Sequence, residues 1–217
     1  MDLLVFDIET IPQQGKLTTT QQENLDKKLA KAFGNETPTN EEYNKKRSFI
    51  MGTNPHFGEI VCIGVKKVLS TGEFDATSLV GTEPEILTKF WDIAKKHRGR
   101  YVHYNGLGFD VPWIIKRSMY HGIKPSNKEF LDTRRYTKYP HFDVQMILAD
   151  WDRYAAVTLD LACDFLKVPS PKEGEVKGDQ VEQAFLDGKI NQIAEYCLRD
   201  VDATHKVYNI VQTYTKF

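Results

Sequence analysis

Cysteine is scarce in this chain, and long apolar runs are missing. The three cysteines, Cys62, Cys163 and Cys197, are an odd number and form no C-x-x-C pair. A disulfide framework is therefore not expected, and a reducing compartment, the cytoplasm, is the predicted location. The amino terminus lacks the basic start and the small-residue cleavage site of a signal peptide. Because no apolar run reaches the roughly 20 residues that cross a bilayer, we expect no attachment to a membrane.

An excess of charge is also absent. The chain has 29 Lys or Arg residues and 30 Asp or Glu residues, for a net charge of −1. Proteins that bind long stretches of nucleic acid usually carry a basic surface. The balance therefore argues against a long, tight nucleic-acid footprint. It leaves room for an enzyme that holds a few nucleotides and lets metal ions offset the charge of the phosphates.

Several common site motifs are missing as well. The six histidines show no H-x-H or H-E-x-x-H spacing, so a zinc site is not expected. The G-L-G sequence at residues 106–108 lacks the third glycine of a dinucleotide-binding loop. No G-x-S-x-G sequence, which is typical of a serine nucleophile, occurs. The sequence thus gives no support for a zinc enzyme, a dinucleotide-dependent enzyme or a serine hydrolase.

The composition that remains is that of an ordinary globular protein. The 217 residues are 41% hydrophobic and 27% charged, which suits one folded domain spanning residues 1–217. Strand-like and helix-like segments follow one another as strand, helix, hairpin, helix, strand, helix and then several helices. This order predicts an α/β fold with a mixed sheet.

The individual elements are predicted from apolar periodicity and from turn and capping residues. Strands are expected at residues 2–8, 59–70, 74–81 and 100–105, with a hairpin turn between the second and the third. Helices are expected at residues 25–33, 84–96, 111–120, 158–166, 180–188 and 190–212. A loop-rich part is expected between residues 122 and 143.

Residues 13–58 differ from the rest because they are rich in Gln, Asn, Thr and Lys. Leu25, Leu29 and Phe33 have helical spacing, and Thr39 is followed by acids as at the start of a second helix. We expect this stretch to be a helical excursion between the first two strands. A mobile surface loop is an equally good interpretation of the same composition.

Three short segments contain the candidate catalytic residues. In the first, FDIET at residues 6–10, Asp7 and Glu9 are two residues apart on a strand and so point to the same face. At the carboxyl end of the strand they would direct two carboxylates at one spot. Their repulsion would destabilise the fold unless cations bind there. Two incidental acids at a solvated strand end are the alternative.

The second segment is NGLGFD at residues 105–110. Here a strand ends, glycines turn the chain, and Asp110 begins a helix that has Pro112 in its first turn. Asp is a favoured N-cap and Pro is tolerated early in a helix, so a plain helix cap explains Asp110 when this segment is taken alone. The glycines suggest a second role, because they let a ligand approach the backbone closely.

The third segment is YCLRD at residues 196–200. On a helix, residues four apart share one face, so the phenol of Tyr196 and the carboxylate of Asp200 point in the same direction. Tyr196 could orient or deprotonate a water molecule, and Asp200 could bind a metal ion. A half-buried Tyr beside a surface Asp is the alternative, and this segment alone does not decide between them.

Taken together and in this order, FDIET, NGLGFD and YCLRD resemble the three exonuclease motifs of the DEDD nuclease superfamily. Tyr196, four residues before the last Asp, marks the tyrosine subclass, whereas the histidine subclass has His at the position of Glu195. The chain is most similar to the proofreading domain of family B DNA polymerases and to its stand-alone bacterial relatives. Residues 55–63, 141–143 and 177–181 agree with that group, so the resemblance covers nearly the whole chain outside about residues 13–50.

The resemblance implies a ribonuclease H-like fold, in which helices flank a five-stranded mixed sheet. It also implies a 3′→5′ exonuclease with two divalent ions, Mg²⁺ or Mn²⁺, which suit hard oxygen ligands. Asp7 would contact both ions, with Glu9 and Asp200 completing one site. Asp110 would lie near the second ion, and Tyr196 would position the attacking water.

The same resemblance implies contacts to the substrate. Asn105 and the backbone near Thr10 and Ile11 would contact the terminal nucleotide. Phe109 would pack against its sugar or base, although packing in the core explains this residue equally well. Asp143 could be a further acid near the cleft, but a structural role is the favoured interpretation.

Three functions are compatible with these residues. The first is a 3′→5′ exonuclease on single-stranded DNA that works in repair or proofreads beside a separate polymerase. An exoribonuclease or oligonucleotide nuclease would use the same chemistry, since nothing in the sequence reads the 2′-hydroxyl. A nucleic-acid-binding module without catalysis is least favoured, because all four acids and Tyr196 are present. The identity of a polymerase or repair partner stays open.

Overall fold

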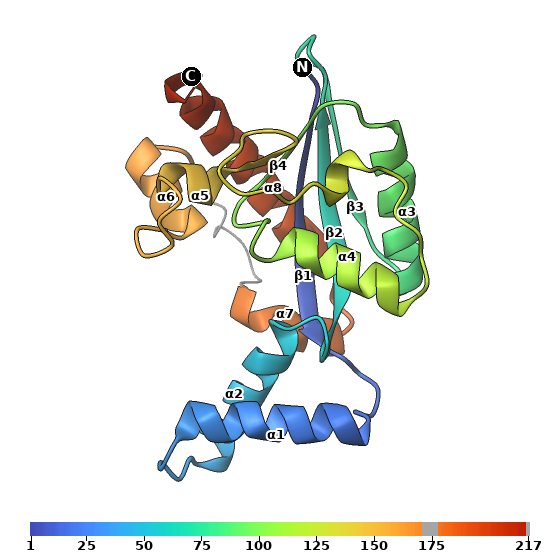
Figure 1. Cartoon of the computed structure of the whole chain (residues 1–217), viewed down its shortest axis with the longest axis vertical. Coiled ribbons are helices and arrows are strands. Elements are labelled where there is room, and N and C mark those ends of the chain that lie inside the picture. The colour runs from blue at the N-terminus through green and yellow to red at the C-terminus, as the bar shows by residue number, and fades with distance from the viewer. Residues whose placement is uncertain (171–177, 216–217) are drawn as a thin grey trace.

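A mixed sheet is the centre of the structure, a computed structural model that describes residues 1–170 and 178–215 (Figure 1). The described part contains one five-stranded sheet with the order β3-β2-β1-β4-β5. Its strands are β1 (Leu3–Pro12), β2 (Gly58–Val68), β3 (Phe74–Leu79), β4 (Arg100–His103) and β5 (His141–Asp143). β1 pairs antiparallel with β2 and parallel with β4. The predicted α/β class and mixed sheet are therefore confirmed.

Helices cover both faces of this sheet (Figure 1). They are α1 (Thr19–Phe33), α2 (Asn40–Gly52), α3 (Glu83–Lys96), α4 (Asp110–Tyr120), α5 (Val144–Leu148), α6 (Leu159–Leu166), α7 (Val181–Leu186) and α8 (Ile190–Tyr214), with short 3₁₀ turns η1 (Glu129–Leu131) and η2 (Gly178–Gln180). α3 and α4 pack on one face, whereas α5, α6 and α8 pack on the other. None of the helices in the described residues combines the length and apolar character that a membrane span needs.

The alternation of β1 assigns its side chains to the two faces, since successive residues of a strand point in opposite directions. Leu4 and Phe6 belong to the core under α3 and α4. Leu3 and Val5 belong to the core under α8. Asp7 continues this second row, so its carboxylate is directed toward α8.

β1 is longer than predicted. The prediction ended this strand at residue 8, but β1 continues to Pro12 and stays paired with β2 as far as Gly58. The pairing register shifts between Glu9 and Thr10. Asp7 and Glu9 therefore lie within the strand and not at its carboxyl end, which corrects the expectation. The last residues of β1 lack a simple apolar alternation, and their pairing partner is distant in the sequence.

The region after β4 also differs from the prediction. β4 ends at His103, two residues earlier than expected, and β5 lies where only loop was predicted. A strand of three residues is too short to show alternation, and the five residues of α5 are too few to show a helical period. Lys177, the first residue of the matching segment 177–181, lies outside the described residues.

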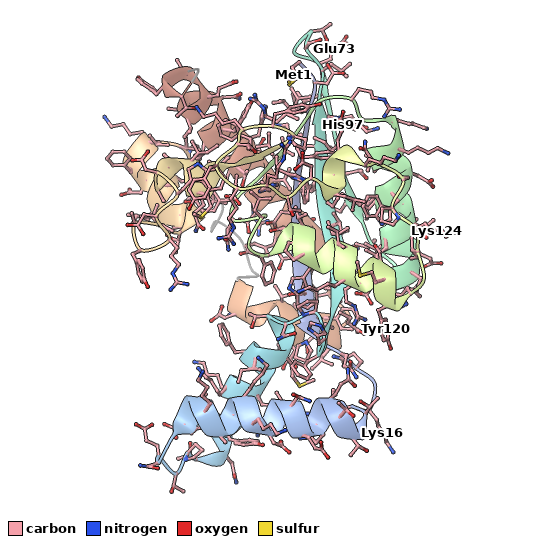
Figure 2. All side chains as sticks on the ribbon, viewed as in Figure 1. Met1, Lys16, Glu73, His97, Tyr120 and Lys124 are labelled. Carbon is pink, nitrogen blue, oxygen red and sulfur yellow. The ribbon has the colours of Figure 1, made fainter. Side chains whose placement is uncertain are left out.

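α1 and α2 lie between β1 and β2 in the sequence and extend beyond the end of the sheet (Figure 1). Each begins with a capping box, formed by Thr18 with Gln21 in α1 and by Thr39 with Glu42 in α2. The two helices enclose a small apolar cluster of their own. Figure 2 places Lys16 beside α1, at the opposite end of the molecule from Met1 and Glu73.

Candidate active site

Four acids from three elements gather on one side of the sheet. They are Asp7 and Glu9 from β1, Asp110 from the start of α4, and Asp200 from α8. The negative charges of Asp110, Glu9 and Asp200 all raise the pKa of Asp7, so the four carboxylates lie within electrostatic reach of one another. The structure therefore brings together residues that are almost 200 positions apart in the sequence.

The close approach of α8 to the sheet depends on Gly64. This residue lies opposite Asp7 in the antiparallel pair of β1 and β2. A Cβ atom at Gly64 would lie 2.9 Å from Sγ of Cys197 and 3.0 Å from Cγ2 of Val201. The amide of Gly64 also donates a hydrogen bond to Sγ of Cys197 at 3.1 Å. A side chain here would push α8, and Asp200 with it, away from β1.

Cys197 is a neighbour of the acids that the sequence analysis did not single out. Its Sγ lies 3.4 Å from the carbonyl oxygen of Asp7 and 3.7 Å from Oδ2 of the same residue. Asp7, Glu9 and Cys197 each offer a ligand atom within 4.8 Å of the others. Burial raises the pKa of the Cys197 thiol well above its usual value. The thiol is therefore protonated, and the carboxylates are the candidate metal ligands.

Asp110 is not the N-cap of α4, so the interpretation of this residue as a plain helix cap is wrong. The N-cap of α4 is Phe109, and Asp110 is the first helical residue. Its Oδ1 accepts a hydrogen bond from the backbone amide of Ile8 at 3.1 Å. That amide is accessible because β4 pairs with β1 only as far as Val5. Asp110 thus takes the place of a sheet partner at the edge of β1, next to Asp7.

Asp143 fixes the loop that leads to Asp110. Its buried carboxylate accepts hydrogen bonds from the amides of Asn105 at 3.0 Å, Leu107 at 2.9 Å and Met146 at 3.2 Å. The last of these bonds caps α5. The structural interpretation of Asp143 is therefore confirmed, because its oxygens are occupied by the backbone on both sides of the turn.

Two buried histidines support the same loop from the other side. The amide of Gly106 donates to Nδ1 of His103 at 3.1 Å, so the ring proton of His103 is on Nε2. Nε2 donates to Nδ1 of His141 at 3.1 Å, and Nε2 of His141 donates to the carbonyl of Phe130 at 2.9 Å. Burial lowers the pKa of both rings to about 3. Because both rings are neutral, each donates one hydrogen bond and accepts one, and the bonds run in sequence from the amide of Gly106 to the carbonyl of Phe130.

Asn105 and Phe109 are at the mouth of this loop. Asn105 is exposed and has a left-handed φ of 61°, and its carbonyl accepts from the amides of Gly108 and Phe109. The ring of Phe109 lies 5.7 Å from the ring of Trp113 and packs on the core under α4. Core packing thus accounts for one side of Phe109, while Asn105 presents its side chain to solvent.

Thr10 and Ile11 offer only their backbone to a ligand. The hydroxyl of Thr10 donates to the carbonyl of Gly52 in α2 at 2.6 Å. The side chain of Ile11 is buried among residues of α7 and α8. Both side chains are thus engaged within the protein, which leaves the backbone of these two residues for contact with a ligand.

Tyr196 is half-buried on α8, and its hydroxyl forms a hydrogen bond with the carboxylate of Asp200. Burial and the charges of Asp200 and Glu9 raise the pKa of this phenol far above its usual value. A phenol must lose its proton before it can act as a base, and this environment opposes that loss. Of the two roles considered for Tyr196, orientation of a water molecule is the one that its surroundings favour.

The electrostatics of the four acids suit a cation. Burial raises the pKa of Asp110 to about 7, and that of Asp200 to about 6. Burial and the charge of Asp200 raise the pKa of Glu9 well above its usual value. Among the residues that the structure describes, no Lys, Arg or His forms an ion pair with any of the four. The charge of Arg199 and the hydrogen bond from Tyr196 lower the pKa of Asp200, but they offset only part of the effect of burial. Carboxylate oxygens are the donors that Mg²⁺ and Mn²⁺ prefer, so the residues fit such ions.

Comparisons with known proteins agree with this architecture. A family B DNA polymerase from the hyperthermophilic archaeon Pyrobaculum calidifontis superimposes with a TM-score of 0.64 and 18% identity, over 98% of this chain and 25% of the polymerase. The chain thus spans about a quarter of that protein, and the similarity confirms the ribonuclease H-like fold. A protein of Methanocaldococcus jannaschii that is described as uncharacterized is 28% identical over 171 residues, which are 74% of this chain and 89% of that protein.

A protein family matches most of the chain. It is described as a predicted 3′-5′ exonuclease related to the exonuclease domain of PolB, and it matches residues 53–216. The match includes Asp110, Tyr196 and Asp200, while FDIET precedes it and is contributed by β1. The chain therefore belongs to the family of 3′-5′ exonucleases that are related to the exonuclease domain of PolB.

Proposed function

We propose that the protein removes nucleotides from the 3′ end of single-stranded DNA by hydrolysis that depends on two divalent ions, Mg²⁺ or Mn²⁺. The observation that carries this proposal is the convergence of Asp7, Glu9, Asp110 and Asp200 without a compensating ion pair among the described residues. Membership of the exonuclease family supports the reaction class.

Each acid has a distinct place in the proposed metal site. The resemblance of the three motifs assigns both ions to Asp7, and the charges of the other three acids, which all raise the pKa of Asp7, support this role. Glu9 and Asp200 complete one ion site, and Asp110 serves the second. When bound, such ions lower the pKa of a water molecule and offset the charge on the departing oxygen.

The remaining residues orient the reactants. The hydroxyl of Tyr196, held by Asp200, orients the attacking water. Asn105 and the backbone at Thr10 and Ile11 contact the terminal nucleotide, and the free side of Phe109 packs against its sugar or base. Positioning of this kind accelerates hydrolysis because the reactants meet in a fixed geometry.

DNA is the proposed substrate because the matching family is related to a domain of a DNA polymerase. RNA ends and short oligonucleotides are the second candidate, since the same acids would hydrolyse either backbone. A binding module without catalysis is disfavoured by the four acids. Four like charges held together in a fold are destabilising, and a protein that only binds nucleic acid would have no use for them.

The test uses single-stranded DNA and the matching RNA, each labelled at the 5′ end and incubated in Mg²⁺, Mn²⁺ or EDTA. Asp200→Asn removes a proposed ligand. Asp202→Asn is its matched control, because Asp202 lies on the same helix but pairs with Lys66 and Lys206 at 2.7 Å. We expect a metal-dependent ladder that shortens from the 3′ end, is lost in Asp200→Asn and remains in Asp202→Asn.

The two nucleic acids separate the candidate functions. Faster shortening of DNA supports the proposal, and faster shortening of RNA replaces DNA by RNA as the substrate. If neither substrate is shortened in either metal, the enzymatic proposal is wrong and the binding module becomes the better interpretation.

A further inference from the structure

Two loops outside the acid cluster contain an unusual concentration of exposed aromatic rings. One precedes β5 and the other joins α5 to α6. In the first, Tyr136 is 75% exposed and Tyr139 is 42% exposed, and in the second, Tyr154 is 84% exposed. Trp151 is half-buried, and its ring centroid lies 5.1 Å from that of Tyr136. Rings this exposed contribute little to the core, so folding alone does not account for their grouping.

Cationic side chains alternate with these rings. Residues 133–139 contain Arg134, Arg135 and Lys138. Arg134 pairs with Asp132 at 2.5 Å, and Lys138 donates to the carbonyl of Thr215. Arg135 is therefore the cation of this loop with which a ligand would interact. In the second loop the guanidinium of Arg153 lies 4.9 Å from the ring centroid of Tyr154 and donates to its hydroxyl at 2.9 Å. Flat rings beside cations are the composition of surfaces that bind single-stranded nucleic acid, because rings stack on bases and cations meet phosphates.

The backbone holds the central pair of rings in an unfavourable conformation. Tyr136 and Trp151 both have a left-handed φ of 64°, and Asp150 has a φ of 48°. Bulky residues rarely adopt this conformation, and when they do the surrounding structure must enforce it. The amide of Trp151 is held by the carbonyl of Met146 at 2.7 Å. The two rings that touch are thus placed by the fold and are not loosely attached.

The loop that joins α5 to α6 is tied to the candidate active site, and the loop before β5 meets it through the contact of Tyr136 with Trp151. Asp143 holds the amide of Asn105 and caps α5, whose five residues span only about 7 Å before the turn at Trp151. The carbonyl of Val157 accepts from the hydroxyl of Tyr104 at 2.9 Å, and Tyr104 immediately precedes Asn105. The ring surface is therefore connected, through α5 and the carbonyl of Val157, to the loop that leads to Asp110.

We infer that this surface, which we call the ring patch (Tyr136, Tyr139, Trp151, Arg153 and Tyr154), binds the single strand on the 5′ side of the nucleotide that is hydrolysed. The inference rests on the proposed function. The exposed tyrosines stack on bases, and Arg153 together with Arg135 meets phosphates. A patch of this kind explains how a chain with a net charge of −1 holds a polyanion, because the attraction is local.

The test measures binding without hydrolysis. Fluorescence anisotropy follows a 5′-labelled oligothymidine of about 12 nucleotides in EDTA, with the wild-type protein and with Tyr136→Ala and Tyr154→Ala. Each substitution removes one stacking ring, so we expect the dissociation constant to rise roughly 5- to 150-fold. A trinucleotide, which ends before the ring patch, should bind all three proteins equally.

Tyr120→Ala is the matched control. Tyr120 is 71% exposed and lies 4.4 Å from the guanidinium of Arg117, so it is the same kind of ring beside the same kind of cation. It lies on the right of the molecule in Figure 2, whereas α5 and α6 lie on the left in the same view. We expect no change in its affinity for either oligonucleotide. Thermal melting of each variant verifies that the exposed rings can be removed without unfolding.

The outcomes separate this inference from the proposed function. If the wild-type protein does not bind the longer oligonucleotide, or if Tyr136→Ala and Tyr154→Ala bind it unchanged, the ring patch does not bind nucleic acid, and a protein contact becomes the better interpretation. Equal weakening by Tyr120→Ala also overturns it. Because the assay needs no hydrolysis, a wild-type protein that binds the strand but never shortens it refutes the nuclease and leaves the ring patch supported.

Discussion

Replacing Asp110 by Asn should make the metal-free protein more stable at neutral and alkaline pH. The substitution removes one of four mutually repelling charges and keeps the shape of the side chain. The carbonyl oxygen of Asn can still accept the hydrogen bond from the amide of Ile8. Stability should therefore change through the lost charge and not through a lost contact, which is unusual for a substitution at a buried site.

The magnitude follows from the pKa of Asp110, which burial raises from 3.8 to about 7. A carboxyl with a raised folded-state pKa contributes stability that is complete below its unfolded pKa and is lost as the pH rises through its folded pKa. The interval is roughly three pH units, and each is worth about 1.4 kcal/mol. Between pH 4 and pH 8, the unfolding free energy of the wild-type protein should therefore fall by about 4 kcal/mol more than that of Asp110→Asn.

Urea unfolding in EDTA at several pH values between 4 and 8 measures this difference, provided that the slopes with urea agree between the two proteins. Adding Mg²⁺ or Mn²⁺ at pH 8 should reverse the order, since ions bind the ionised wild-type cluster and stabilise the folded state by mass action. Parallel pH curves for the two proteins, or a less stable variant at pH 8, would refute the reasoning.

Further predictions concern the support of the site. Asp143→Ala should lower the unfolding free energy by at least about 3 kcal/mol, because buried amides lose their acceptor, and a small change in urea unfolding would contradict this. Gly64→Ala should cost about 1–3 kcal/mol through the collision with Cys197, whereas Gly15→Ala, with no atom nearby, should leave the unfolding midpoint unchanged. Tyr196→Phe should lower kcat roughly 100-fold, because the attacking water loses its positioning group, and an unchanged kcat would argue against orientation of water by its hydroxyl.

Much of the fold could be predicted because it follows from local patterns. The period of two in β1 places Asp7 and Glu9 on one face, and Thr39 followed by acids marks the start of α2. Thr82 and Glu85 likewise form the capping box that begins α3. These features depend on neighbours within a few residues, which the sequence alone contains.

The assembly of the acids could not be derived from such patterns. Asp110 reaches Asp7 only because β4 separates from β1 after Val5 and leaves the amide of Ile8 unpaired. The position of Asp200 depends on Gly64, which has no local signal that it faces a helix. The resemblance of the three motifs supplied the grouping, and the structure supplies the physical reason for it.

The contacts that hold the loop at residues 105–109 could not be predicted from the sequence either. His103 and His141 meet because β4 and β5 are parallel neighbours, and β5 is too short to be recognised by alternation. Cys197 contacts Asp7 because α8 crosses the sheet closely. The only sequence signal for this contact was that Cys197 lies between Tyr196 and Asp200 in YCLRD. Apolar residues occupy such positions in many helices, so the signal is not specific.

The site is held in place by bonds that do not involve a metal ion. Asp110 is held by the edge of β1, its loop is held by Asp143 and the neutral His103, and α8 is held against Gly64. The repulsion among the acids is therefore opposed by the backbone around them, and the ligands do not need to be assembled by the ion. A preorganised site of this kind binds a cation more tightly than a site that the ion must assemble. The carboxylates are already held together, so the bound cation relieves their repulsion. It follows that substitutions at these supports should weaken metal binding even though they remove no ligand, and the loop with Asp143 is where this coupling is most direct.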